Sequence, residues 1–334
     1  MTIDFHAHVV PAPYVDVVRR GDVPGVLLES AGGTETLRID GGGEAGPVAQ
    51  RIPLTAAYLE PAARVAAMDE AGVDVQVLSA VQFMYHYWLE ADLAAALARV
   101  ANDGIVALAR DQPARFVAMA TVPLQDATLA VAELERVHAA GVRSVEIGTH
   151  VAGGPLDAPA LAAFWARAEA LGTVVFVHPY APLGRDRLGS YYLRNTLGNP
   201  FETAVAASRL IFGGVLERHP RLRFVLAHGG GALPSLVGRL NAGFVVDASC
   251  RERGARRPSA YLGQLWYDTI THDVPALEYL ISRVGASRVV LGSDYPFEIG
   301  DLDPVRTVEK LDVDAAAREA ILHGNAAGLL GLAG

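Results

Sequence analysis

Short apolar, β-branched runs alternate with longer stretches of helical periodicity along the chain. This alternation is typical of repeated βα units that build a parallel sheet, and we count eight of them. The expected strands are 2–5, 73–78, 116–121, 144–147, 174–177, 224–227, 265–267 and 289–291. The expected helices are 61–71, 90–110, 126–140, 158–171, 201–218, 232–247, 274–284 and 314–322. Eight alternating units favour a closed (β/α)8 TIM barrel over an open sheet.

Residues 14–58 are too many for a simple βα loop, and glycines at 32–33 and 41–43 separate short strand-like pieces. We predict a small β-hairpin insertion after strand 1, over the barrel mouth; a flap without regular structure is the alternative. The length of 334 residues suits one barrel or two small domains. Because no low-complexity linker divides the chain, we expect residues 1–334 to form a single domain.

Composition narrows the possible partners and cofactors. The single cysteine, Cys250, rules out an intramolecular disulfide and a sulfur-bound zinc cluster. The net charge of −9 and the lack of basic runs argue against nucleic acid, since residues 251–257 are better explained as a solvated loop. No apolar run is long enough to span a membrane and no leader precedes the first strand, so we expect a cytoplasmic protein.

Polar residues gather where the expected strands end. Chemistry in such barrels occurs at that end, because all of the βα loops meet there. The first strand runs into His6 and His8, which point to the same side of an extended chain. His178 follows the fifth strand and Asp294 the eighth. Three imidazoles and one carboxylate suit zinc or a similar divalent ion, with one position open for water or substrate.

His228 follows the sixth strand, at the same end of the predicted barrel. An isolated histidine is more often a hydrogen-bonded or surface residue than a ligand, but the clustering at strand ends reverses those odds. His150 and His272 lie on the correct face, where each could support the site or pack a loop. The remaining histidines fall in helices or outer loops, and we assign no function to them: His86, His138, His219 and His323.

The fourth expected strand bears on the number of metal ions. Barrels with two ions commonly bridge them with a carboxylated lysine on that strand. Here it reads Ser-Val-Glu-Ile-Gly over 144–148, and Lys310 is the only lysine in the chain. We therefore expect one ion, zinc or another single divalent transition metal, although Glu146 could bridge in place of a lysine.

Several motifs together resemble the amidohydrolase superfamily, and within it the branch of aminocarboxymuconate-semialdehyde decarboxylase (ACMSD) and related non-oxidative decarboxylases. The resemblance covers nearly the whole chain. The motifs are Asp-Phe-His-Ala-His at 4–8, the run at 68–77, Val-Pro-Leu-Gln-Asp at 122–126, His-Pro at 178–179, Ala-His-Gly-Gly-Gly at 227–231 and Leu-Gly-Ser-Asp-Tyr-Pro-Phe at 291–297.

The resemblance implies roles for individual residues. The metal ligands would be His6, His8, His178 and Asp294. His228 matches the family's histidine that activates water or moves a proton, and Arg51 and Arg239 match arginines that hold substrate carboxylates. The planar fork of arginine suits this task because it binds a carboxylate through two hydrogen bonds. In the related decarboxylase the arginine matching Arg239 comes from the adjacent chain, which implies a homodimer.

We expect a metal-dependent non-oxidative decarboxylase acting on an unsaturated or aromatic carboxylic acid. The substrate can differ from that of ACMSD, because this chain lacks the tryptophan after His-Pro at 178–179 and a lysine near 41–43. The same site could instead hydrolyse a C–C, ester or amide bond, and the arginine pair favours decarboxylation over that reaction. An inert barrel used as a scaffold is the third possibility, which a missing ligand would support; none is missing.

Overall fold

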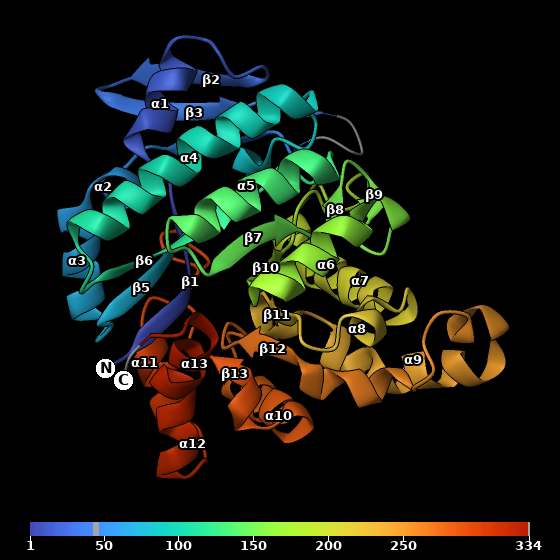
Figure 1. Cartoon of the computed structure of the whole chain (residues 1–334). Helices are drawn as coiled ribbons and strands as arrows, with labels where there is room; N and C mark the ends of the chain where they lie inside the picture. The colour runs from blue at the N-terminus through green and yellow to red at the C-terminus, as the bar shows by residue number, and fades with distance from the viewer. Residues whose placement is uncertain (43–46, 333–334) are drawn as a thin grey trace.

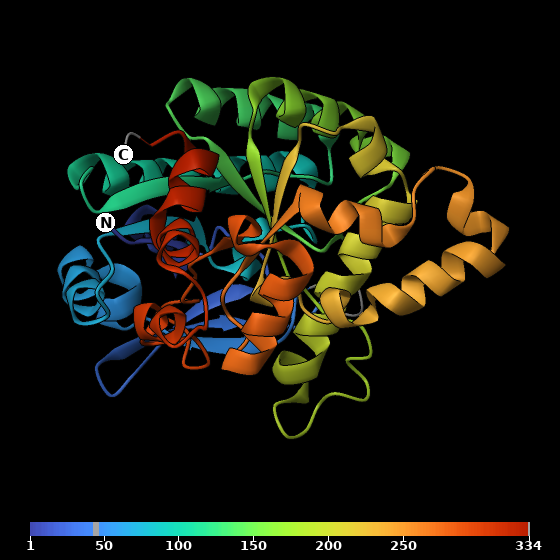
Figure 2. The same ribbon diagram turned by 90° about the horizontal axis from the view of Figure 1, so that it is seen from below.

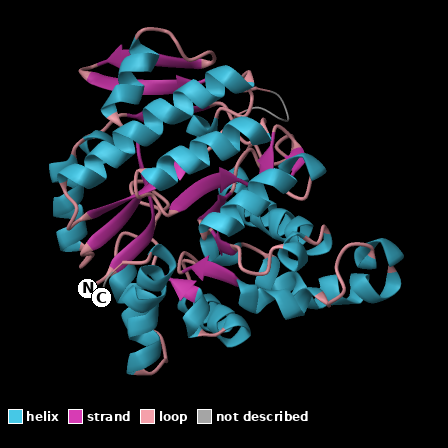
Figure 3. Cartoon of the chain, viewed as in Figure 1, coloured by secondary structure: helices cyan, strands magenta, loops and turns pink. Residues whose placement is uncertain are grey.

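The structure is a computed structural model of the chain and describes residues 1–42 and 47–332. Part of the predicted insertion, 43–46, and the end of the predicted domain, 333–334, lie outside the described residues. Eight parallel strands form one sheet with helices around it (Figures 1, 2 and 3), which confirms the predicted barrel. In sheet order the strands are β1 (Ile3–Val9), β5 (Val75–Ala80), β6 (Phe116–Thr121), β7 (Ser144–Gly148), β10 (Val174–His178), β11 (Arg223–Leu226), β12 (Leu265–Asp268) and β13 (Val289–Val290).

The two ends of this sheet meet, so that the barrel is nearly closed. The main-chain N–H of Phe5 donates to the carbonyl of Leu291 at 2.8 Å, and that of His8 donates to Tyr295 at 2.7 Å. The N–H of Asp294 donates to the carbonyl of His6, also at 2.8 Å. Closure thus places the residues after β13 beside β1.

The helices largely follow the predicted pattern. Around the barrel lie α3 (Pro61–Glu70), α4 (Ala91–Asp111), α5 (Ala127–Ala139), α6 (Ala162–Leu171), α7 (Asn199–Phe212), α8 (Val215–Arg218), α9 (Leu233–Val246), α10 (Val274–Val284), α11 (Pro304–Glu309), α12 (Ala315–Glu319) and α13 (Asn325–Leu330). The helix expected over 201–218 is two helices, because Gly214 between them adopts a left-handed φ of 71°. Neither α11 nor α13 was predicted.

Short helical segments of one or two turns join these elements. All are 3-10 turns except η3 and η8, which are π turns. They are η1 (Gln82–Tyr85), η2 (Pro159–Leu161), η3 (Arg194–Gly198), η4 (His228–Gly230), η5 (Ala248–Arg251), η6 (Pro258–Gln264), η7 (Ala286–Arg288) and η8 (Ala320–Gly324). A small hairpin of β8 (His150–Val151) and β9 (Gly154–Pro155) follows β7. In the described part of the chain, no helix is long and apolar enough to cross a membrane.

Two apolar clusters hold the barrel together. The larger one packs the outward side chains of the strands against the surrounding helices. The smaller one joins residues near the starts of the strands, such as Ile3, Val75 and Val174, to Ala326 and Leu330 of α13. Apolar packing therefore closes the end of the barrel where the strands begin, which leaves the opposite end for polar groups.

The insertion differs from the simple hairpin that we predicted. It contains α1 (Ala12–Arg19), an antiparallel sheet of β2 (Val26–Ala31), β3 (Thr34–Ile39) and β4 (Gln50–Pro53), and α2 (Ala56–Leu59). The hairpin of β2 and β3 is present, but a third strand and two helices accompany it. The sequence did not predict α1, because this helix is short and valine-rich. Its buried residues Tyr14, Val15 and Val18 share one helical face.

Candidate active site

Four potential ligands meet where the strands of the barrel end. His6 and His8 lie on β1, His178 ends β10, and Asp294 follows β13. Each offers one ligand atom, and these atoms all lie within 4.8 Å of one another. All four side chains are buried. The structure therefore brings together every ligand that the sequence predicted.

Hydrogen bonds at Nδ1, on the side of each ring away from the cluster, orient the three imidazoles. The Nδ1 atom of each faces a hydrogen-bond acceptor, and an N–H donated there leaves Nε2 unprotonated to bind a cation. The acceptors are a carboxylate oxygen of Asp268 for His6 at 2.7 Å, the carbonyl of Ala80 for His8 at 3.1 Å and the carbonyl of Pro179 for His178 at 3.1 Å. This arrangement directs the lone pairs of all three Nε2 atoms into one space.

That space fits a metal ion. The Nε2 atoms of His6 and His8 lie 3.1 Å apart, and Oδ1 of Asp294 lies 3.2 Å and 3.1 Å from them. The same Oδ1 is buried and makes no well-aligned hydrogen bond to any described residue. Lone pairs of nitrogen and oxygen this close repel one another unless a cation lies between them, and a set of three imidazoles and a carboxylate suits zinc or a similar ion.

The pKa values of these side chains also favour a bound cation. Burial lowers the pKa of His6, but Asp294 and Asp268 outweigh that effect and raise the pKa to about 10. Burial would raise the pKa of Asp294, yet the neighbouring imidazoles, His6 foremost, hold it well below its usual value. Burial also keeps the pKa of His178 well below its usual value. A negative carboxylate beside a neutral imidazole attracts a cation, for which a proton on His6 competes.

His228 lies at the edge of this cluster. It begins η4, directly after Ala227, with a left-handed φ of 56°. Its Nε2 is 3.5 Å from Oδ2 of Asp294, and its buried Nδ1 makes no hydrogen bond to a described residue. His228 is therefore near enough to exchange a proton with a group bound at the cluster, while the other oxygen of Asp294 faces His6 and His8.

A cavity of about 740 Å³ opens over the cluster, and His178, His228 and Asp294 lie in its wall. Pro47, Val48 and all four residues of β4, from the insertion, also line it. Arg51 contributes one cation to this cavity and forms an ion pair with Glu29. A second, smaller cavity of about 320 Å³ also contains His228 and Asp294.

Arg239, unlike Arg51, lies away from the cavity. It lies on α9 and is exposed, and it does not line either cavity that contains Asp294 in the described part of the chain. Figures 1 and 2 show α9 and the segment after it extending beyond the barrel. Within one chain, Arg239 is therefore not part of the site.

Three other histidines lie outside the ligand set. His86 is not in an outer loop, as the sequence suggested: it is fully buried and its Nε2 lies 2.8 Å from the hydroxyl of Tyr14. His150 Nε2 lies 3.1 Å from the carbonyl of Ala181, which agrees with loop packing. His272 is exposed and lines the smaller cavity.

Sequence reasoning missed three residues at the site. Asp268 holds the ring of His6, as described above, and the amide nitrogen of Gln82 lies 3.2 Å from Nε2 of His178. Arg194 adds a second cation to the larger cavity. A signal existed only for Asp268, because it is a carboxylate directly after the expected strand 265–267.

Comparison with known proteins agrees with this geometry. A family model described as amidohydrolase matches residues 3–332. A 2-amino-3-carboxymuconate-6-semialdehyde decarboxylase from Dictyostelium discoideum is 37% identical over 276 residues, which cover 82% of this chain and 77% of the relative. The enzyme of the same name from Caenorhabditis elegans is 31% identical over 382 aligned positions, covering 98% of this chain and 94% of the relative.

Solved structures share the fold. IDCase of Metarhizium anisopliae, in its apo form, superposes with a TM-score of 0.86 at 26% identity, over 99% of this chain and 97% of that one. A dihydroxybenzoic acid decarboxylase of Polaromonas sp. JS666 superposes with a TM-score of 0.80 at 24% identity, over 99% and 97% of the two chains, and its structure contains manganese and the inhibitor 2-nitroresorcinol.

The relatives confirm the predicted class of enzyme, because the activities in their names are decarboxylations. The barrel and the buried set of four potential ligands agree with the family model, which matches nearly the whole chain. The chain belongs to the amidohydrolase family.

Proposed function

We propose that this chain is a metal-dependent non-oxidative decarboxylase that acts on an unsaturated or aromatic carboxylic acid. The observation that carries the proposal is the buried set of His6, His8, His178 and Asp294, with His228 beside it, at the base of a cavity that contains Arg51. The decarboxylase names of the family relatives support the same reaction class.

The four-residue set would hold one divalent ion, and we propose zinc because imidazole and carboxylate ligands suit it. When bound, such an ion polarises a substrate oxygen and lowers the pKa of water. Manganese in the Polaromonas enzyme makes a second metal worth testing in parallel. All four side chains are buried, so they would shield a bound ion from bulk water on the side of the barrel interior.

The chain's own residues would divide the remaining work. In decarboxylation the bond from the ring or alkene carbon to the carboxylate breaks, carbon dioxide leaves, and a proton takes its place on that carbon. His228 lies where it could deliver that proton, since its Nε2 points toward Asp294 and its ring lines the cavity. Arg51 would bind an acidic group of the substrate. To do so it would give up its exposed ion pair with Glu29.

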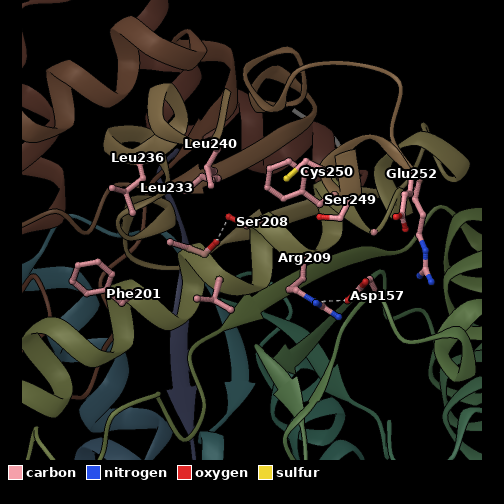
Figure 4. Close-up of a pocket in the computed structure, with 15 residues that line it drawn as sticks. Asp157, Phe201, Ser208, Arg209, Leu233, Leu236, Leu240, Ser249, Cys250 and Glu252 are labelled. Atoms are coloured by element: carbon pink, nitrogen blue, oxygen red, sulfur yellow. Dashed lines mark hydrogen bonds and ion pairs between the residues drawn. The ribbon is translucent and has the colours of Figure 1, made fainter. Parts of the chain in front are cut away.

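We further propose that the chain forms a homodimer through α9. Figure 4 shows a groove beside this helix, where Leu233, Leu236 and Leu240 face Phe201 and other residues of α7. Phe201 is 48% exposed, and Val246 at the end of α9 is 82% exposed. Large apolar side chains left open on a projecting helix favour a protein partner, and a second copy of the chain would cover the same surface on both subunits.

Such a dimer would give Arg239 a function. It lies on α9 between Leu236 and Leu240, which line the groove, and in its own chain it does not reach the cluster. We propose that Arg239 binds a substrate carboxylate in the neighbouring subunit. The expectations of a single domain over 1–334 and of a cytoplasmic location stay predictions.

The proposed function is tested by incubating the zinc-loaded and manganese-loaded protein with a panel of muconate semialdehydes, hydroxybenzoates and other ring-cleavage products. Carbon dioxide and product mass are followed together. Decarboxylation yields a product lighter by the mass of carbon dioxide. Hydrolysis would instead give two fragments whose masses add up to that of the substrate plus water, with no gas released.

A further inference from the structure

Asp268, the last residue of β12, is a fully buried carboxylate outside the four-residue metal set. Its Oδ2 lies 2.7 Å from Nδ1 of His6 and accepts the main-chain N–H of His228 at 2.9 Å. Its Oδ1 accepts the N–H groups of Gly229 at 2.8 Å and Ile270 at 3.1 Å. Each oxygen thus contacts two nitrogens that belong to different parts of the site.

The contact with His6 decides which ring nitrogen can bind an ion. Both oxygens of Asp268 already accept main-chain N–H groups, and Nδ1 of His6, 2.7 Å from Oδ2, is placed to donate to the same carboxylate. Nε2 is then the nitrogen that faces His8 and Asp294. Main-chain carbonyls accept in the same way for the other two imidazoles, and in the described part of the chain His6 alone of the three has a carboxylate oxygen within hydrogen-bond distance of its Nδ1.

The contacts with the main chain fix the turn that carries His228. His228, Gly229 and Gly230 all have left-handed φ angles, of 56°, 61° and 75°. This conformation is unfavourable for a histidine, because its Cβ crowds the neighbouring peptide. Asp268 accepts the N–H groups of His228 and Gly229, which stabilises the turn in the form that aims the imidazole at Asp294.

We propose that Asp268 is a positioning residue that links the metal site to the proton donor. Its carboxylate keeps His6 in the metal-binding tautomer and at the same time holds the turn of His228. The link to turnover rests on the function proposed above. The tautomer of His6 and the conformation of the His228 turn do not depend on that function, since both can be measured on the metal-loaded protein without a substrate.

The test compares Asp268→Asn with the parent and with Asp273→Asn as a matched control. Asp273 lies in the following loop and only caps α10, a task that asparagine performs equally well. In Asp268→Asn either orientation of the amide turns its NH2 group against two of the four N–H donors. We expect zinc affinity to fall about 10- to 100-fold, by competition with a chelator. We also expect faster hydrogen exchange at the amides of His228 and Gly229, with both readouts unchanged in the control.

A spectroscopic signature separates positioning from a general loss of structure. In the zinc-loaded parent labelled with nitrogen-15 histidine, the nitrogen shifts of His6 should show Nδ1 protonated and Nε2 bound to the ion. This measurement needs no variant, so it decides the question even if Asp268→Asn does not fold. Binding of the ion through Nδ1 would overturn the proposal, as would unchanged zinc affinity together with unchanged exchange in Asp268→Asn.

The failure of the proposed reaction would look different. A parent that binds zinc but decarboxylates no acid of the panel contradicts the proposed function and leaves the zinc affinity and amide exchange of Asp268→Asn to be judged separately. If the parent is active, turnover of Asp268→Asn at saturating zinc should still fall, because the turn of His228 is loosened. Full turnover at saturating zinc would overturn the link to His228.

Discussion

Glu146 lies behind His8: its Oε1 is 3.8 Å from Nδ1 of the imidazole, whereas Nε2 on the opposite edge faces Asp294 at 3.1 Å. The hydroxyl of Tyr85 donates to the same Oε1 at 2.8 Å. Glu146, on the fourth strand of the barrel, β7, thus contacts the Nδ1 side of His8 and is not among the residues whose ligand atoms meet. This position fits a residue that supports a ligand better than one that bridges two ions.

The first prediction is that purified protein contains about one zinc-like ion per chain, since one four-residue set is present in the described residues. Glu146→Gln should keep that ion, because the amide oxygen can still accept from Tyr85. His178→Ala should lose most of it. Elemental analysis of the three proteins measures this, and two ions per chain in the parent would contradict the single-ion site.

The second prediction separates His228 from the ligands. His228→Ala should keep most of its metal, because Nε2 lies beyond the inner cluster, 3.5 Å from Asp294. Turnover should fall by roughly two to four orders of magnitude, the usual effect of removing an acid or base. Metal content and turnover are measured on the same sample. Parallel loss of both would make His228 a ligand.

The third prediction concerns pH. In the metal-free protein the carboxylates of Asp294 and Asp268 overcome burial and raise the pKa of His6 to about 10, above its ordinary value of 6.5. His6 thus carries a proton between these pH values, and a metal ion must displace it. Apparent zinc affinity should rise about tenfold per pH unit in this window, as measured with a chelator of known proton affinity. An affinity that does not change with pH would argue against a protonated His6.

The fourth prediction tests the shared site. Arg51→Ala and Arg239→Ala should each lose most activity as homodimers. After subunit exchange, a mixed dimer has one intact site and one doubly altered site if Arg239 acts across the interface. Random equal mixing should then restore about a quarter of wild-type sites. Verified exchange without recovery would place Arg239 in its own subunit's site or outside any site.

The sequence predicted the barrel and the ligand set for physical reasons. Buried parallel strands read as apolar runs, and the residues that follow them converge at one end of a barrel. His6, His8, His178 and Asp294 could therefore be grouped without coordinates. The two-residue spacing of His6 and His8 already placed both rings on one side of β1.

Other features depended on contacts between distant segments. Nothing local distinguishes Asp268 from any carboxylate at the end of a strand; its role appears only when closure of the barrel places His6 of β1 against it. His86 reads as a loop residue until its contact with Tyr14 of α1 is seen. Arg194 reaches the cavity through a π turn, which has no sequence signal as clear as helical periodicity.

The most direct test follows the carboxyl carbon itself. An acid found in the panel, with an isotope label in the carboxylate, is incubated with parent protein reconstituted with zinc and with metal-depleted His178→Ala. We predict that the parent releases the label as carbon dioxide in equal amount to the product, and that the product takes up one solvent proton at the carbon that lost it. His178→Ala should release none. Label retained in an organic product, with no labelled carbon dioxide released, would contradict decarboxylation, and equal release by His178→Ala without metal would contradict the site.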